Sequence, residues 1–452
     1  MTTPIVDFVR SYAERKTLRL HMPGHKGCAQ LGVEDLDITE IDGADVLYAA
    51  RGIIRESEEN AARLFGSGRT LYSTEGSSLA IRAMLNLAVL AAKERGVPPR
   101  IAAGRNAHKT FTGAAALLDL EVSWLFGEAE NLLSCRITPE FLARSLDALD
   151  EKGQKPIAVY LTSPDYLGNT LDVRGLAAVC HEREILLLVD NAHGAYLRFL
   201  RPSRHPIDLG ADACCDSAHK TLPVLTGGAY LHVASRAPRV FFEYAEQSMA
   251  LFASTSPSYL ILQSLDLANR TLAEGYADRL ALLADRLDSF KAELRARGFT
   301  LVGDEPMKLT VATKSWGYTG EAVAEYLADR LIVCEFADTD FVTMMFTPAS
   351  NGEEIARLSD AFAELSSLPP IDIHPPVPMP TERACSIREA TLSLSEELAI
   401  EDCLGRVLAS AQLSCPPAIP IVVCGERIDD QAIECMKYYG IEKCRVMKPS
   451  EV

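Results

Sequence analysis

A lysine and an aspartate each follow a short apolar segment near the middle of the chain. Lys220 ends the run that begins at Asp216, and Asp190 ends the apolar segment 185–190. At the ends of two strands, an amine could hold an aldehyde as a Schiff base, and a carboxylate could keep a pyridine nitrogen protonated. The pair therefore predicts a site for pyridoxal phosphate.

Two further segments could hold the phosphate of this cofactor. Gly76, Ser77 and Ser78 lie between a predicted strand and a predicted helix. The first turn of a helix offers N–H groups and the positive end of the helix dipole, which suit a phosphate. An ordinary serine cap of the helix is the alternative interpretation. Ser217, three residues before Lys220, is another hydroxyl within reach of the phosphate.

Two histidines could complete the site. His193, three residues after Asp190, could orient that carboxylate or be an ordinary core histidine. His108 begins a predicted helix after a strand, where its ring could stack on the cofactor or have a structural role alone. The sequence contains no HExxH, CxxC or GxSxG pattern, so we predict no metal site and disfavour a serine hydrolase.

Apolar strands alternate with helices between residues 69 and 233, which is typical of an α/β fold with a mostly parallel sheet covered on both faces. The predicted strands are 69–73, 100–104, 156–162, 185–190, 211–216 and 228–233, and the predicted helices are 77–93, one from about 106, and 175–183. Ligands of such sheets bind beyond the carboxyl ends of the strands. Asp190 and the segment before Lys220 meet that requirement.

The sequence predicts an N-terminal arm followed by three domains. We place the arm at 1–60, a large cofactor-binding domain at 61–298, a small α/β domain at 299–368, and a C-terminal domain at 369–452 that opens with a proline-rich linker. Within the large domain, Ser256-Pro257 predicts a helix start, and apolar residues at steps of three and four lead to a stop at Gly298. We therefore expect one long helix there.

Composition narrows the class of protein. The 452 residues include 62 acidic and 45 Lys or Arg side chains, giving a net charge of −17, which argues against nucleic-acid binding and suits a small cationic substrate. Twelve cysteines without a regular framework indicate reduced thiols. We find no signal peptide and no apolar run of the ~20 residues that span a membrane. A cytoplasmic protein without membrane partners is expected.

With these residues in place, the chain resembles the Orn/Lys/Arg decarboxylases, over nearly its whole length and in the short form of that family. The matching segments are His21 to Lys26, Asp37 to Glu40 with Gly43 and Asp45, Gly76 to Ser78, Arg105 to Lys109, Thr162 to Pro164 with Tyr166 and Gly168, Asp190 to His193, Ser217 to Lys220, Ser254 to Pro257, Arg388 to Ala390, and Pro416 to Pro420 with Gly425 and Glu426. The resemblance implies a pyridoxal phosphate enzyme with the aspartate aminotransferase fold.

The resemblance also implies roles for individual residues. Lys220 would form the Schiff base, Asp190 would pair with the pyridine nitrogen, and His108 would stack on the ring. The residues implied around the phosphate or the Schiff base are Ser77, Ser78, Ser217 and His219. Family members form dimers with the site at the interface, so we expect a homodimer or a dimer-based oligomer in which Thr255 and Ser256 reach the partner's cofactor.

The chain departs from the family pattern at four places. Thr226-Gly227-Gly228 stands where a Gln is common, Glu75 where an Asn is common, Asp165 where a Thr is frequent, and Ala418 where a Gly is usual. None of these changes removes a reacting group. Glu75 and Asp165 bear on the choice of substrate.

The expected reaction is the pyridoxal phosphate-dependent α-decarboxylation of lysine, arginine or ornithine, with His219 or Lys220 returning a proton to Cα. The distal cation of the substrate needs a carboxylate, which could equally be a solvated or capping group; the possible residues are Glu40, Asp42, Asp45, Glu75 and Asp165. An aminotransferase or aldolase-type lyase of the same fold is one alternative. A catalytically silent homologue that binds the cofactor is another.

Overall fold

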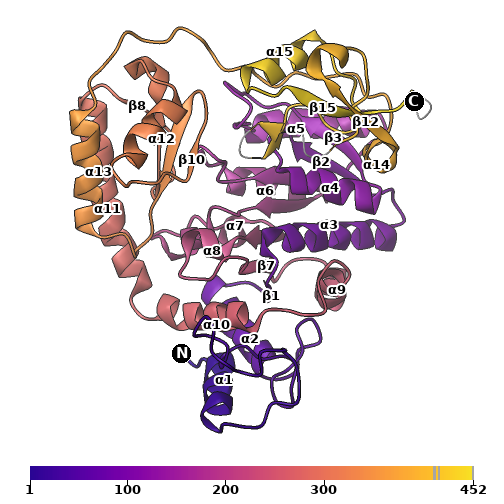
Figure 1. The fold of residues 1–452 in the computed structure, drawn as a ribbon. Helices are drawn as coiled ribbons and strands as arrows, with labels where there is room; N and C mark the ends of the chain where they lie inside the picture. Colours follow the sequence, from indigo (N-terminus) through magenta and orange to yellow (C-terminus); the bar gives the residue numbers. More distant parts are fainter. Residues whose placement is uncertain (411–413, 416–417, 450–452) are drawn as a thin grey trace. The chain divides into compact units, whose positions relative to one another are not determined.

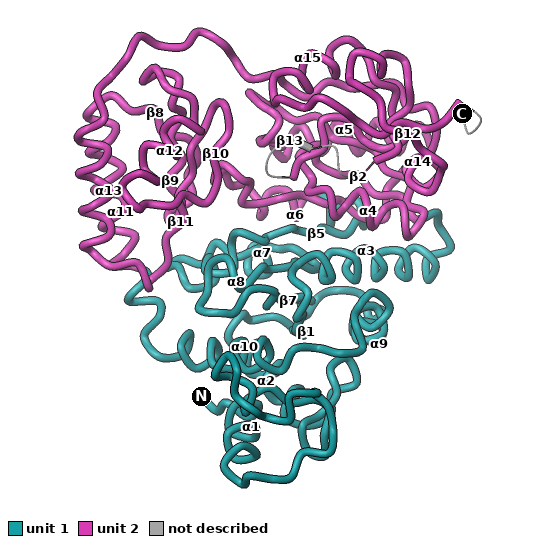
Figure 2. Tube along the Cα trace, viewed as in Figure 1, with its two compact units in different colours: residues 1–98, 180–280 teal, residues 99–179, 281–452 magenta. Residues whose placement is uncertain are grey.

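The computed structural model describes residues 1–410, 414–415 and 418–449. Pro416 and Pro417, part of the proline-rich motif, lie outside the described residues. The chain divides into two compact units, which are residues 1–98 with 180–280 and residues 99–179 with 281–452 (Figure 2). We call them unit 1 and unit 2.

Unit 1 contains four strands of the central sheet. They are β1 (Arg69–Ser73), β5 (Leu186–Asp190), β6 (Ala213–Asp216) and β7 (Ala229–Val233), in the order β1-β7-β6-β5. Two of them, β1 and β7, are labelled in Figure 1. Strands β5 and β6 are parallel, whereas β7 is antiparallel to both β6 and β1. Every residue of β5, β6 and β7 is buried, because helices cover both faces of the sheet.

The helices of unit 1 pack on these strands. They are α1 (Pro4–Glu14), α2 (Ile53–Phe65), α3 (Gly76–Arg95), α7 (Pro206–Leu209), α8 (Ala218–Thr221), α9 (Arg239–Ala250) and α10 (Tyr259–Ala273), with the 3₁₀ turn η1 (Ala195–Phe199). Helix α3 contacts β6, β7 and α9, and α2 contacts β1, α1 and α10. The buried residues of α3 surround most of its circumference, so it behaves as a core helix rather than a surface one.

The single long helix predicted from Ser256 to Gly298 is wrong, because two helices occupy this stretch. Helix α10 begins after its cap Ser258, and α11 (Tyr276–Ala296) follows after a break. Gly275 adopts a φ of +70°, a left-handed conformation that ends α10 and that glycine adopts without strain. The apolar repeat continues across the break, so periodicity alone did not reveal it.

Unit 2 contains the remaining strands of the central sheet and a second, antiparallel sheet. The first group is β2 (Arg100–Gly104), β3 (Glu121–Leu125) and β4 (Ala158–Thr162), all parallel in the order β4-β2-β3. Its helices are α4 (Lys109–Leu118) and α5 (Pro139–Glu151), and α6 (Val173–Glu182) begins in this unit and ends in unit 1. The second sheet has the order β10-β11-β9-β8 and comprises β8 (Thr300–Val302), β9 (Lys308–Ala312), β10 (Phe336–Ala337) and β11 (Phe341–Met345), with η2 (Thr313–Trp316), α12 (Gly320–Ala328) and α13 (Gly352–Glu364).

The C-terminal region belongs to unit 2 and follows the segment 365–380, which has no helix or strand. Its elements are α14 (Ile387–Leu392), β12 (Ser395–Ala399), η3 (Ile400–Asp402), β13 (Ser414–Cys415), β14 (Ile419–Pro420), α15 (Asp430–Tyr438) and β15 (Lys443–Met447). One apolar cluster joins it to earlier parts of the unit, and its members include Leu132, Leu133, Leu167, Phe341, Ile400, Ile419, Val422, Met436 and Val446.

The predicted strands and helices between residues 69 and 233 are confirmed, with boundaries that differ by a few residues. No helix in the described part of the chain is long and apolar enough to cross a membrane.

A buried arginine fastens the C-terminal region within unit 2. Arg105 donates to the carbonyl oxygens of Pro420 (2.7 Å) and Ile421 (2.8 Å) and lies 4.0 Å from Glu426. We expect Arg105→Ala to lower the free energy of unfolding by about 3 kcal/mol, because it leaves buried acceptors without their donor. Urea unfolding would measure this. Arg136→Ala is the control, since that side chain is 76% exposed and its removal should change stability by less than about 0.5 kcal/mol.

A buried glutamate gives unit 1 a pH-dependent stability. Glu58 of α2 accepts the N–H of Tyr72 (2.9 Å), and burial raises its pKa from 4.5 to about 8 despite that bond. The folded chain therefore keeps a proton that the unfolded chain releases, so stability should fall as the pH rises from 4.5 to about 8.

Glu58 should lower the free energy of unfolding by up to about 1.4 kcal/mol for each pH unit in this range. In Glu58→Gln this part of the pH dependence should disappear. Urea unfolding of both proteins at several pH values would measure the difference. A constant stability difference across this pH range would contradict the assignment.

Candidate active site

Unit 1 brings the predicted lysine next to one of the predicted histidines. Lys220 Nζ lies 2.9 Å from His193 Nε2. Lys220 belongs to α8, a helix of four residues that follows β6 after its N-cap Ser217. The backbone N–H of Lys220 donates to the carbonyl of Ser217 (3.0 Å), and the backbone N–H of His219 donates to the carbonyl of Gly228 (3.1 Å). These bonds fix the backbone of the short helix, and the contact with His193 Nε2 holds the amine.

Asp190 lies at the end of β5 and is 3% exposed. Its Oδ1 accepts the backbone N–H of Ala192 (3.2 Å) and the thiol of Cys215 (3.5 Å). Burial raises the pKa of the Cys215 thiol well above its usual value, and the charge of Asp190 adds to that effect. Cys215 therefore remains a protonated donor at neutral pH.

The start of α3 has the features of an anion site. This helix of 20 residues begins at Gly76, and its N-cap residue, Glu75, makes no side-chain cap. The Oγ of Ser217 donates to the Oγ of Ser77 (2.8 Å), so hydroxyls from two predicted segments meet there. A Cβ at Gly76 would meet no atom within 4 Å, so open space lies beside the first turn. N–H groups, hydroxyls and space together fit a phosphate.

The Gly227-Gly228 departure has a structural explanation. Gly227 has a φ of +97°, and a Cβ there would lie 2.9 Å from the carbonyl oxygen of Thr74. The carbonyl of Gly227 accepts the N–H of Gly76 (2.7 Å), while that of Gly228 accepts from His219. This glycine pair therefore supports both the start of α3 and the helix that carries Lys220.

His108 lies in unit 2, where it is the N-cap of α4. Its Nδ1 accepts the backbone N–H of Thr110 (3.0 Å). That bond fixes the ring and places a hydrogen on Nε2, since a neutral imidazole carries one N–H. Stacking on a cofactor stays a prediction.

Thr255 and Ser256 lie in the exposed segment between α9 and α10. The backbone N–H of Ser256 donates to the Oγ of Ser254 (3.1 Å), and the N–H of Ser254 donates to Glu75 (2.7 Å). Glu75 thereby ties this segment to the residue before α3. The contribution of Thr255 and Ser256 to a partner's site stays a prediction.

Three of the carboxylates considered for the distal cation hold backbone in place. Asp45 accepts N–H groups from Val46, Arg51 and Gly52 and so supports the entry to α2. Asp165 accepts from the N–H groups of Leu167 and Asn169, and burial raises its pKa to about 6. Glu75 binds Ser254, as described above. Glu40 and Asp42 are exposed.

The sequence did not single out five buried residues of unit 1 that bind Asp190 or belong to the hydrogen-bond network around Asp216. Cys215 binds Asp190, and Asn191, His205 and His232 all bind the buried carboxylate of Asp216. The alternation of side chains along β6 was the available signal, because it places Cys215 and Asp216 on opposite faces. The sequence could not show what each face would meet.

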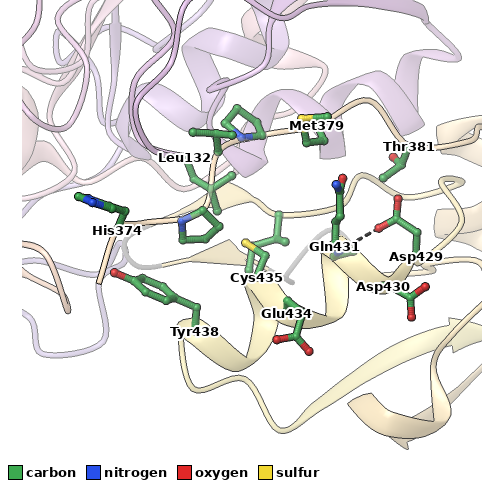
Figure 3. Close-up of a pocket in the computed structure, with 15 residues that line it drawn as sticks. Leu132, His374, Met379, Thr381, Asp429, Asp430, Gln431, Glu434, Cys435 and Tyr438 are labelled. Atoms are coloured by element: carbon green, nitrogen blue, oxygen red, sulfur yellow. Dashed lines mark hydrogen bonds between the residues drawn. The ribbon is translucent and has the colours of Figure 1, made fainter. Parts of the chain in front are cut away.

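The described part of unit 2 contains two notable cavities. One, of about 520 Å³, lies between the segment 374–381 and α15, with His374 and Tyr438 at one end (Figure 3). None of the predicted site residues lines it. The other, of about 780 Å³, is lined by Asp165 and by further acidic groups, among them Glu128, Glu130 and Asp304.

Comparison with known proteins identifies the family. The model of the Orn/Lys/Arg decarboxylase major domain matches residues 3–296, and that of the C-terminal domain matches residues 377–444. The chain belongs to the Orn/Lys/Arg decarboxylase family. The resemblance found in the sequence is thereby confirmed, and with it the prediction of a pyridoxal phosphate-dependent decarboxylase enzyme.

Individual relatives of this decarboxylase agree with the family assignment. Arginine decarboxylase of Bacillus subtilis is 29% identical, over 95% of this chain and 92% of the relative. Arginine decarboxylase of Halalkalibacterium halodurans is also 29% identical, over 95% of this chain and 91% of the relative.

Two solved structures confirm the predicted fold class. Constitutive lysine decarboxylase of Escherichia coli superimposes with a TM-score of 0.77 at 17% identity, covering 99% of this chain and 82% of that one. Lysine decarboxylase of Francisella novicida gives a TM-score of 0.80 at 16% identity, covering 99% of this chain and 81% of that one. The α/β fold with a mostly parallel sheet is shared.

The glycine pair provides a test of how the site is supported. Gly227→Ala should lower the free energy of unfolding by about 2–3 kcal/mol and weaken pyridoxal phosphate binding, because the new Cβ meets the Thr74 carbonyl in a left-handed backbone. Gly153→Ala is the matched control. Gly153 also has a positive φ (+68°), but nothing lies within 4 Å of its Cβ, so only about 1 kcal/mol of strain is expected. Equal losses in the two variants, measured by urea unfolding, would contradict the close-contact explanation.

Proposed function

We propose that this protein uses pyridoxal phosphate to remove the α-carboxylate of a basic L-amino acid, giving the corresponding amine and CO2. Family membership and the arginine decarboxylase relatives, which match 95% of the chain, support this reaction. The observation that carries the proposal is the contact of 2.9 Å between Lys220 and His193 in the unit that also holds Asp190 and the start of α3.

The residues present fit the cofactor. When bound, pyridoxal phosphate supplies a ring that takes up the electrons of the broken Cα–carboxylate bond. Lys220 would hold its aldehyde, and buried Asp190 would hold the pyridine N–H. The first turn of α3 would bind the phosphate together with the hydroxyls of three residues, namely Ser77, Ser78 and Ser217. Gly76 leaves the space that this group needs.

His193 and His219 can control protons around the amine. His193 Nε2 can accept a proton from Lys220 Nζ at 2.9 Å, which leaves a neutral, nucleophilic amine. His219 Nδ1 lies 3.0 Å from the carbonyl oxygen of Gly228, which can only accept, so Nδ1 carries a hydrogen. His219 Nε2 is then the nitrogen that exchanges a proton. Either His219 or Lys220 would return a proton to Cα.

Arginine is the first substrate to test, because the curated relatives named above are arginine decarboxylases. Lysine and ornithine belong to the same proposal. The net charge of −17 is compatible with any of these cations. We further propose a homodimer or a dimer-based oligomer in the cytoplasm, with Thr255 and Ser256 near the partner's cofactor and His108 stacked on the ring.

The decisive experiment traces the cofactor and the product together. Borohydride reduction of the holoprotein, followed by peptide mapping, should place the label on Lys220. Incubation with arginine, lysine and ornithine, followed by mass spectrometry, should show an amine and CO2. Lys220→Ala should lose the visible absorbance and about three orders of magnitude or more in turnover. Lys152→Ala, which changes an exposed lysine, should match the wild type.

The other outcomes separate the alternatives. A keto acid or an aldehyde as product would indicate an aminotransferase or an aldolase-type lyase of the same fold. A labelled Lys220 without any product would indicate a silent homologue. A label on another residue, or none, would refute the proposed site.

A further inference from the structure

A second buried carboxylate lies beside the predicted site and has no role in the reaction described above. Asp216 ends β6, one residue before Ser217, and is fully buried. Its Oδ2 accepts from His205 Nε2 (3.1 Å) and His232 Nε2 (3.2 Å), and its Oδ1 accepts from Asn191 Nδ2 (2.7 Å). Three donors from three segments of unit 1 therefore converge on one carboxylate, which explains how the charge is tolerated inside the sheet.

The hydrogen-bond pattern assigns the protons of this network. His205 Nδ1 accepts the backbone N–H of Ile207 (3.4 Å), so the hydrogen of its ring is on Nε2, facing Asp216. His232 Nδ1 lies 2.8 Å from Thr70 Oγ1, which can donate to it. Burial acts to raise the pKa of Asp216, but the combined effect of the two histidines is larger and opposite. The pKa of Asp216 therefore lies well below its ordinary value. Burial lowers the pKa of His232, so we assign a neutral ring beside an ionised carboxylate.

The same three side chains could be considered as metal ligands. The two Nε2 atoms and the Asp216 oxygen lie within 4.8 Å of one another. A metal would need Nε2 of His205 without its hydrogen, which would put the hydrogen on Nδ1 against the N–H of Ile207. The structure therefore favours a hydrogen-bonded network over a metal centre.

Asn191 connects this network to Asp190. Its side chain donates to Asp216, and its backbone N–H donates to the carbonyl of Cys215 (3.0 Å). A Cβ at Gly194 would lie 2.0 Å from Asn191 Oδ1, so glycine at that position makes room for the amide. Two hydrogen bonds thus hold Asn191, immediately after the carboxylate that is predicted to face the cofactor.

Strand β6 holds Asp190 and Asn191, the first two residues of the turn after β5, through side chains on its opposite faces. Cys215 donates its thiol to Asp190, while Asp216 accepts from Asn191. Neighbouring residues of a strand point to opposite faces, so residues 190 and 191 cannot rotate together without breaking one of these bonds. A carboxylate that must face a ring nitrogen needs this kind of restraint.

We propose that Asp216, with His205 and His232, is a positioning residue that orients Asp190 through Asn191. This inference rests on the proposed function, because it assumes that Asp190 pairs with the pyridine nitrogen. Asp216 itself would touch neither substrate nor cofactor. Its role is to set the direction and the rigidity of the turn that begins at Asp190.

The test compares Asp216→Asn with Asn191→Ala. An amide at 216 has only one acceptor oxygen, so either Asn191 or both histidines, which share Oδ2 in the wild type, lose their acceptor. Asn191→Ala breaks the connection without altering Asp216. We expect both variants to bind pyridoxal phosphate about tenfold more weakly, as equilibrium dialysis measures, and to share an altered visible circular dichroism spectrum of the bound cofactor. The double variant should bind pyridoxal phosphate no more weakly than the weaker of the two single variants, because both changes break the same contact between Asn191 and Asp216.

Asp266→Asn is the matched control. Asp266 is fully buried in unit 1 and also accepts from three donors, which are the N–H groups of Ile5 and Val6 and the hydroxyl of Ser57. Its partners belong to α1 and α2, so its loss should lower the thermal stability of the protein but leave the cofactor spectrum unchanged. A general loss of stability would therefore not imitate a positioning effect.

Each outcome has a clear meaning. Unchanged affinity and spectrum in Asp216→Asn and Asn191→Ala, with Lys220 still labelled by borohydride, would overturn this inference and leave the proposed function standing. Additive effects in the double variant would also overturn it. One metal ion per purified wild-type chain, lost in Asp216→Asn, would replace it with a metal centre. A wild-type protein without the label on Lys220 would instead refute the proposed function.

Discussion

The burial of two carboxylates at the ends of neighbouring parallel strands is the constraint on which the site depends. Asp190 and Asp216 end β5 and β6, and both are buried. An isolated charge in such a place costs several kcal/mol, so each carboxylate needs donors nearby. The chain supplies them from the turn after β5, from β6 and β7, and from His205 at the start of α7. The direction of each carboxylate follows from where those donors lie.

Backbone hydrogen bonds hold the segments that carry Lys220 and the start of α3. The amides of residues 76, 219 and 220 bind carbonyls of the same unit, and Gly227 and Gly228 accept two of these bonds. Glycine permits this close approach because it has no Cβ. The two glycines that depart from the family pattern therefore support the backbone at the start of α3 and before Lys220.

Much of the fold could be predicted from the sequence because apolar segments and turn residues act locally. The six predicted strands between 69 and 233 exist, and the family assignment agrees with the motifs around Lys220. The failure at 256–298 has a local cause as well, since Gly275 ends α10 while the apolar repeat continues in α11.

The carboxylates proposed for the distal cation could not be judged from local sequence. Asp45 and Asp165 were chosen by charge, but backbone N–H groups surround both.

By itself, the sequence determined which chemical groups are available, because it places an amine at 220, a carboxylate at 190, and hydroxyls at 77 and 217. It also determined that these groups follow strands, since strand and helix periodicities are local. Only the tertiary structure decided that His193 meets Lys220, that Ser217 meets Ser77, and that His205 and His232 share Asp216. Those contacts join residues 11 to 140 positions apart, and such pairing depends on how strands assemble, which no local pattern encodes.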